Sequence, residues 1–186
     1  MIYSFNLYNK LASDGIYTSL KKISQNNKTA AVPVILCVGS DLSVGDSLGP
    51  LVGTMLKERL CEHNIYIYGT LPKPVTAKEI NYINNFLKYA HPEQKVIAVD
   101  AAVGDSNDVG LIKIASKALN PGSGANKKLN SVGDISIIGV VAEKSIFNYA
   151  LFSATRLNMV YRMADIISNA IYDYIEDLLS GSSNTA

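Results

Sequence analysis

The stretch PVILCVGSDLSVGDSLGP, Pro33 to Pro50, changes character twice along its length. Its first part is apolar and β-branched without alternation, which predicts a strand that is buried on both faces of a sheet. A loop rich in glycine and serine follows, and it carries two acids, Asp41 and Asp46. Beyond it apolar residues recur at helical spacing, and Pro50 suits a first helical turn, where N–H groups are free. The stretch therefore predicts a strand, a loop and a helix, with Asp46 as the helix N-cap.

Strand and helix patterns alternate through the rest of the chain. Four further segments have the composition of strands, and they are NIYIYG (64–69), KVIAVDA (95–101), VGLIKIA (109–115) and ISIIGVVA (135–142). We expect the third of these at an edge of the sheet and the fourth at its centre, while the second ends in Asp100. One more helix opens at PVTAKEI, where Thr76 and Glu79 match a capping box, and another closes the chain from about residue 154 to residue 179.

This alternation predicts a three-layer α/β/α sandwich with a mostly parallel sheet. We expect a single domain over residues 1–186 because no second core and no internal repeat is visible. Within it, residues 1–31 have weak patterns and are expected to supply one packing helix before the core. Residues 32–179 form the α/β core, and residues 180–186, which end in GSSNTA, are expected to be disordered.

The composition limits the classes of function. Hydrophobic residues make up 48% and charged residues 18% of the 186 residues, as in an ordinary globular protein. The net charge of +1 attracts neither nucleic acid nor acidic lipid, so we expect neither as a partner. No apolar run approaches the roughly 20 residues of a membrane span, and the first residues lack the layout of a secretory signal. We therefore expect a soluble cytoplasmic protein, with Cys37 and Cys61 as buried thiols; an oligomer stays open.

Asp46 and Asp100 are the candidate catalytic pair. Ligands bind open α/β sheets beyond the carboxyl ends of the strands, where neighbouring parallel strands bring these two acids into one crevice. Two close carboxylates cannot both ionise cheaply, so one keeps a proton. The charged acid can then take a proton from water and the neutral one can donate to a leaving nitrogen, as amide hydrolysis requires. We expect Asp46, at a helix N-terminus, to be the base, and Asp100, between Val99 and Ala101, to hold the proton.

A purely structural role is the alternative for both acids, because aspartate caps many helices and closes many turns. We interpret Asp41 and Asp105 as solvated loop residues. His63 and His91 are expected at the surface, and no Cys/His spacing predicts a metal site, so we expect no metal and no cofactor. The segment PGSGANKK (121–128) is either a flap over the crevice or a mobile loop.

Three motifs together resemble the YyaC-type sporulation protein family. They are VGSDLSVGDSLGPLVG (38–53), VIAVDAAVG (96–104) and LNPGSGANKK (119–128), in this order. That family is related to the germination protease of spore-forming bacteria and, more distantly, to hydrogenase maturation endopeptidases. The resemblance covers most of the chain and implies a phosphorylase/hydrolase-like α/β/α fold. It also implies an aspartic-type peptidase without metal, in which Asp46 and Asp100 are the catalytic residues.

The chain also departs from the proteins that it resembles. Ser40 stands where the germination protease has asparagine after the glycine, and the larger insertions of that enzyme are missing. The hydrogenase maturation enzymes bind nickel with a histidine from a later segment, whereas both histidines here precede residue 92, so nickel is not expected. The candidate substrate-binding residues lie in the two glycine loops, and they are Gly39, Ser40, Asp41, Ser123 and Gly124.

The resemblance and the acid pair together predict a metal-independent peptidase of sporulation or germination. Its substrate would be a peptide or protein, with small acid-soluble spore proteins as candidates, in the forespore or spore core. The alternative is a non-catalytic sporulation protein of the same fold that binds a peptide or protein partner. A phosphate binder at the helix N-terminus is a third reading. The acids disfavour it, because like charges about 4 Å apart repel by about 4 kcal/mol at an intermediate dielectric.

Overall fold

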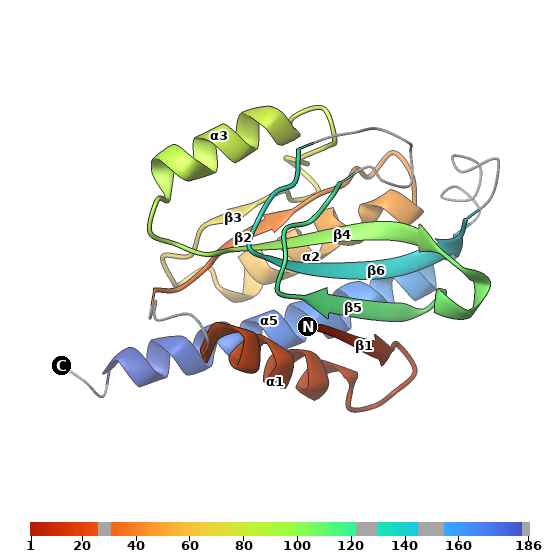
Figure 1. Cartoon of the computed structure of the whole chain (residues 1–186), viewed down its shortest axis with the longest axis horizontal. Helices are drawn as coiled ribbons and strands as arrows, with labels where there is room; N and C mark the ends of the chain where they lie inside the picture. Colours follow the sequence, from red (N-terminus) through yellow and green to blue (C-terminus); the bar gives the residue numbers. More distant parts are fainter. Residues whose placement is uncertain (26–30, 122–129, 145–154, 184–186) are drawn as a thin grey trace.

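A mixed sheet of six strands lies at the centre of the molecule (Figure 1). The computed structural model describes residues 1–25, 31–121, 130–144 and 155–183. The strand order is β1-β5-β6-β4-β2-β3, and among these strands only β5 runs against the others. The strands are β1 (Ile2–Asn6), β2 (Val34–Cys37), β3 (Ile67–Tyr68), β4 (Val96–Gly104), β5 (Leu111–Ala115) and β6 (Ile135–Glu143).

Helices cover both faces of this sheet, so the predicted three-layer α/β/α sandwich is confirmed (Figure 1). One face carries α1 (Ala12–Gln25), α2 (Leu48–Arg59) and α5 (Leu157–Ser183), and the other carries α3 (Ile80–Ala90). Two short 3₁₀ turns, η1 (Gly45–Ser47) and η2 (Ser106–Asp108), lie in connecting segments. None of the helices in the described ranges combines the length and the hydropathy of a membrane span.

The central strands contribute side chains to two cores, one on each face of the sheet. Toward the three-helix face they present Ile35, Ile97 and Val99, which are fully buried. Toward α3 they present Leu36 and Ala98, also fully buried. Both faces need apolar residues, so these runs show no polar alternation, which is why the sequence pattern predicted β2 and β4. Each fully buried aliphatic side chain of this size stabilises the fold by roughly 1.5–3 kcal/mol.

The N-terminal segment and the 109–115 segment differ from the sequence-based expectation. The chain begins with a strand, β1, which pairs antiparallel with β5, Ile2 lying opposite Ala115. β1 is therefore the edge strand on this side of the sheet, and β5 is an interior strand between β1 and β6. Exposed and half-buried residues alternate in β1, which has no fully buried position. Such an edge strand has a weak apolar pattern, and this is why the sequence did not reveal it.

The closing helix also differs from its expected bounds. α5 begins at Leu157, and the preceding residues 145–154 lie outside the described ranges. At the other end α5 continues to Ser183, so residues 180–183, which we expected in a disordered tail, are helical. Ser180 Oγ donates a hydrogen bond of 2.8 Å to the carbonyl of Glu176, one turn earlier.

The capping box predicted before α3 forms in part. The N–H of Thr76 donates to the Glu79 carboxylate at 2.9 Å, as the motif requires. The helix itself begins later, at Ile80, so Glu79 occupies the N-cap position. The Thr76 hydroxyl bonds the same carboxylate. The two side chains thus close a turn in front of the helix.

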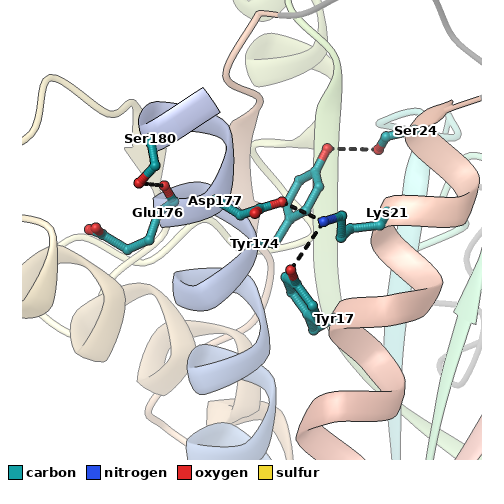
Figure 2. Close-up of polar contacts among 7 residues, drawn as sticks. All are labelled: Tyr17, Lys21, Ser24, Tyr174, Glu176, Asp177 and Ser180. Atoms are coloured by element: carbon teal, nitrogen blue, oxygen red, sulfur yellow. Dashed lines mark hydrogen bonds and ion pairs between the residues drawn. The ribbon is translucent and has the colours of Figure 1, made fainter. Parts of the chain in front are cut away.

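A polar cluster joins α1 to the C-terminal half of α5 (Figure 2). Lys21 forms an ion pair with Asp177 at 2.8 Å and donates to the hydroxyl of Tyr17 at 3.2 Å. Beside it the hydroxyl of Tyr174 donates to Ser24 Oγ at 2.7 Å. Tyr174 is buried, whereas the charged pair is exposed. The cluster therefore aligns the two helices at the rim of the larger core.

Candidate functional site

The loop after β2 folds back tightly on the strand end. The N–H of Val38 donates to the Val99 carbonyl of β4 at 2.7 Å, so the strand direction persists for one residue. Gly39 then adopts φ +141°, and a Cβ there would lie 2.1 Å from the carbonyl oxygen of Asp46. A Cβ on Gly49 would lie 2.0 Å from the carbonyl oxygen of Val38. The two glycines thus permit a backbone approach that no side chain allows, and this approach places Asp46 at the strand end.

Asp46 lies inside the 3₁₀ turn η1 and is not the N-cap of α2, which corrects the sequence-based expectation. The N-cap position belongs to Ser47, whose side chain makes no capping hydrogen bond. Two backbone hydrogen bonds instead fix the position of Asp46. Its N–H donates to the Ser43 carbonyl at 3.1 Å, and its carbonyl accepts from the N–H of Ser40 at 3.0 Å. The short turn inserted before α2 moves Asp46 away from the cap and toward the sheet.

Asp100 lies in the middle of β4 and does not end it, because β4 continues to Gly104. It pairs with Ile138 of β6 on one side. On the other side the ladder with β2 ends at the pair Cys37 and Val99, so Asp100 is the first residue of β4 beyond β2. The ladder between β2 and β4 thus stops one residue before Asp100.

The Asp100 carboxyl group is buried, with 7% of the residue exposed. It accepts a hydrogen bond of 2.8 Å from the N–H of Ala101 through Oδ1. Burial raises the pKa of Asp100 well above its ordinary value, and the negative charge of Asp46 raises it further. The Ala101 N–H opposes these effects in part. Asp100 therefore keeps its proton at pH values where an ordinary aspartate is ionised.

Burial also raises the pKa of Asp46, and the backbone N–H of Ser40 lowers it in part. Of the two shifts the one at Asp100 is the larger. Asp46 is thus the acid that ionises first, and Asp100 is the acid that holds the proton. The expectation that a helix N-terminus favours the ionised form of Asp46 is not met, because Asp46 is not a helix cap and burial raises its pKa.

The remaining candidate substrate-binding residues differ in how exposed they are. Ser40 is half-buried, and its hydroxyl accepts from the N–H of Leu42 at 3.2 Å. Asp41 is exposed, as expected for a solvated loop residue. Ser123 and Gly124 lie outside the described ranges.

Leu42 is a feature that sequence reasoning missed. It is 93% exposed, so it projects from the loop between Asp41 and Asp46 into solvent. A large apolar residue among glycine, serine and aspartate is the signal that was available in the sequence. Ser43 Oγ, one residue further, is buried without a hydrogen-bond partner among the described residues.

His91 differs from its expected surface position, since it is 7% exposed. Its Nε2 lies 2.8 Å from the hydroxyl of Tyr68, its Nδ1 lies 2.9 Å from Gln94 Oε1, and the ring of Tyr66 packs at 4.3 Å. It follows α3 and precedes β4, at the end of the sheet away from the acid pair. His91 therefore acts as a packing residue that the aromatic neighbours and Gln94 satisfy. His63 is exposed, as expected, with Glu176 at 3.0 Å.

The two cysteines differ in burial. Cys37 is fully buried, and burial raises the pKa of its thiol. Cys61 is exposed, so the expectation of a buried thiol is wrong at this position. Within the described ranges no three His, Cys, Asp or Glu side chains cluster in a way that could hold a metal ion.

Comparisons with known proteins place this chain in a family. A family model described as "Protein of unknown function (DUF1256)" matches residues 4–170. The "Uncharacterized protein YyaC" of Bacillus subtilis (strain 168) is 40% identical over 149 residues, which are 80% of this chain and 72% of that protein. A NiFe hydrogenase maturation protease, HycI from Thermococcus kodakarensis KOD1, aligns over 83% of this chain and 99% of its own, with 19% identity and a TM-score of 0.43. The predicted resemblance to YyaC-type proteins is thereby confirmed, and the chain belongs to the DUF1256 family of proteins of unknown function.

Proposed function

We propose that this protein is a metal-independent peptidase that uses Asp46 and Asp100 as its proton-transfer groups. The observation that carries the proposal is the electrostatic coupling of the two acids: the charge of Asp46 raises the pKa of the buried Asp100. An acid that is kept neutral next to one that is ionised is the arrangement that general acid–base catalysis needs. The alternative is a purely structural role, in which each acid caps its own local turn. That role does not require the two acids to be close to each other.

The proposed reaction follows from these protonation states. Asp46, as carboxylate, takes a proton from a water molecule while the water oxygen attacks the peptide carbonyl carbon. Asp100, as the neutral acid, donates a hydrogen bond to the developing oxyanion and then its proton to the leaving nitrogen. The C–N bond breaks, and a carboxylic acid and an amine are released. The proton taken up by Asp46 restores the starting state by passing to Asp100.

A role in sporulation or germination is part of the proposal. It rests on the three motifs shared with the YyaC-type family, and small acid-soluble spore proteins are the substrates that it suggests. The exposed Leu42, in the same loop as Asp46, offers an apolar contact for a peptide chain.

The test is cleavage of purified small acid-soluble spore proteins by the purified chain. We expect Asp46→Asn and Asp100→Asn each to lower the cleavage rate by roughly 10²–10⁴-fold, the usual contribution of a proton-transfer group. Asp105→Asn is the matched control, because Asp105 is exposed and its side chain caps nothing. Cleavage that survives both substitutions in the acid pair would refute the catalytic assignment.

The second candidate function is a non-catalytic sporulation protein that binds a peptide or protein partner. The exposure of Leu42 favours it, since 93% exposure of an apolar side chain at a loop tip suits partner contact as well as substrate contact. This reading predicts that a partner captured by the wild-type chain is recovered uncut and is lost with Leu42→Ser. Recovery of shortened partner fragments from wild type, and of intact partner from Asp100→Asn, would favour the peptidase.

A further inference from the structure

A cleft lies where α5 begins. Its volume is about 370 Å³, and its walls come from the connection after β1, the end of β6 and the first turns of α5. Apolar side chains that include Leu7, Val141 and Met159 form one part of its lining. Neither Asp46 nor Asp100 contributes to it.

The polar part of this cleft is strongly cationic. The chain has three arginines, and two of them, Arg156 and Arg162, line the cleft together with Tyr8 and Asn158. The guanidinium of Arg162 lies over the ring of Tyr8, 5.3 Å from its centroid, which holds this long side chain against the cleft wall. Arginine presents a planar fork of N–H donors that matches carboxylate and phosphate oxygens.

Neither arginine is neutralised by the protein itself. All 16 acidic residues of the sequence fall within the described ranges, and none of them lies within ion-pair distance of Arg156 or Arg162. Four basic side chains of the described ranges do form ion pairs, among them Lys21 with Asp177 and Lys113 with Asp108. Two arginines facing one cleft without a counter-charge therefore leave a positive site open to an external anion.

The start of α5 adds to this field. α5 spans Leu157–Ser183, and the first N–H groups of any α-helix have no acceptor within the helix. The N–H groups of Met159 and Val160 already donate to the Arg156 carbonyl, at 3.0 and 3.3 Å. The helix start therefore adds only a partial positive charge, of the same sign as the two arginines, and its residues Asn158 and Met159 line the cleft. The apolar lining on the other side would contact an uncharged portion of a bound molecule.

We propose that this cleft is a binding site for an oxyanion group, carboxylate or phosphate, carried on an apolar body. Arg156 and Arg162 bind the anion, the first turn of α5 assists them, and Leu7, Val141 and Met159 contact the apolar part. The proposal does not depend on the proposed peptidase, because it uses none of the residues of the acid pair.

The test is a calorimetric titration of the full chain with each of four probes. The probes are N-acetyl-leucine, N-acetyl-leucine amide, phenyl phosphate and inorganic phosphate. We expect at least one of the two anions with an apolar body to bind, and to bind about tenfold more tightly than the uncharged amide or inorganic phosphate, which is about 1.4 kcal/mol. Preference for N-acetyl-leucine identifies a carboxylate ligand, and preference for phenyl phosphate identifies a phosphate ligand.

Substitutions of the two arginines test whether the anion binds in this cleft. Arg156→Gln and Arg162→Gln should each weaken binding of the preferred anion by about tenfold or more, whereas Arg156→Lys and Arg162→Lys should retain part of it. Lys57→Gln is the control, since it removes the same charge from an exposed position on α2. Circular dichroism of each variant shows whether it is folded, and a variant that is not folded is replaced by its lysine counterpart. Equal affinity for the amide, failure of both apolar anions to bind up to about 10 mM, or an equal loss in Lys57→Gln would overturn the proposal.

Discussion

The charge of Asp46 in the turn η1 raises the pKa of Asp100 in β4, although the two acids belong to different elements of the fold. Burial is the larger cause of the shift at Asp100 and the Asp46 charge is the second. The ionised Asp46 therefore disfavours the loss of the Asp100 proton. The loop after β2 positions Asp46, and the charge of Asp46 in turn favours the protonated form of Asp100 that the proposed reaction needs.

Asp46→Asn should lower the apparent pKa of Asp100, because it removes the second cause of the upward shift. The pKa should nevertheless stay above the ordinary aspartate value of about 3.9, since the burial of Asp100 is unchanged. Carbon-detected NMR titration of the Asp100 carboxyl group measures this pKa in wild type and variant, and so tests both expectations. Asp41→Asn serves as the comparison, because it removes a charge from an exposed position of the same loop. An Asp100 titration that is identical in wild type and Asp46→Asn would show that the two acids are too far apart to interact.

Asp100→Asn should make the folded protein more stable at pH 7. The folded state holds the Asp100 proton more tightly than the unfolded chain does, so the stability from this group is fully present below about pH 3.9. It is lost as the pH rises through the folded pKa. Asparagine keeps the oxygen that accepts from the Ala101 N–H and never ionises. We expect the melting temperature of the variant to exceed that of wild type by at least about 2 °C at pH 7, and the difference to shrink toward pH 4. A variant that is less stable than wild type at pH 7 would contradict the assignment of a buried, neutral Asp100.

Gly39→Ala should destabilise the fold and disturb the acid pair together. Its φ of +141° is unfavourable for alanine, and the added Cβ would lie 2.1 Å from the carbonyl oxygen of Asp46. We expect a loss of about 2–5 kcal/mol in the free energy of unfolding. Gly181→Ala in α5 is the opposite case, because nothing lies within 4 Å of its Cβ position, and alanine there should add about 0.5–1 kcal/mol. Urea denaturation of the two variants measures this contrast, and equal effects would mean that the close approach at Gly39 is not rigid.

The polar cluster between α1 and α5 offers a contrast between buried and exposed contacts (Figure 2). Tyr174→Phe removes the donor of a 2.7 Å hydrogen bond to Ser24 from a buried position. It should cost about 1 kcal/mol, which is about 2–4 °C in melting temperature for a chain of this size. Lys21→Met breaks the ion pair with Asp177, but both groups are exposed and water solvates them well, so we expect no measurable change. A larger loss in Lys21→Met than in Tyr174→Phe, by thermal unfolding, would contradict this ranking.

Several elements of the fold could be predicted from local pattern alone. β2, β4 and β6 are apolar without alternation because each lies between two helical layers, and α2, α3 and α5 have the apolar spacing of helices with one buried side. The two acids also stood out in the sequence, since charged residues next to such buried runs need a reason to be there. These signals depend only on neighbours in the chain, which is why composition and spacing were enough to detect them.

The sequence by itself therefore determined the layered architecture and the identity of the candidate acids. Tertiary structure alone decided that β1 and not β5 is the edge strand, that His91 is buried, and that Asp46 lies in a 3₁₀ turn. It also decided that Asp100 is buried and that the charge of Asp46 acts on it. The physical reason is the same in each case. Strand pairing, burial and charge coupling depend on distances between residues that are far apart in the chain, and local patterns do not contain those distances.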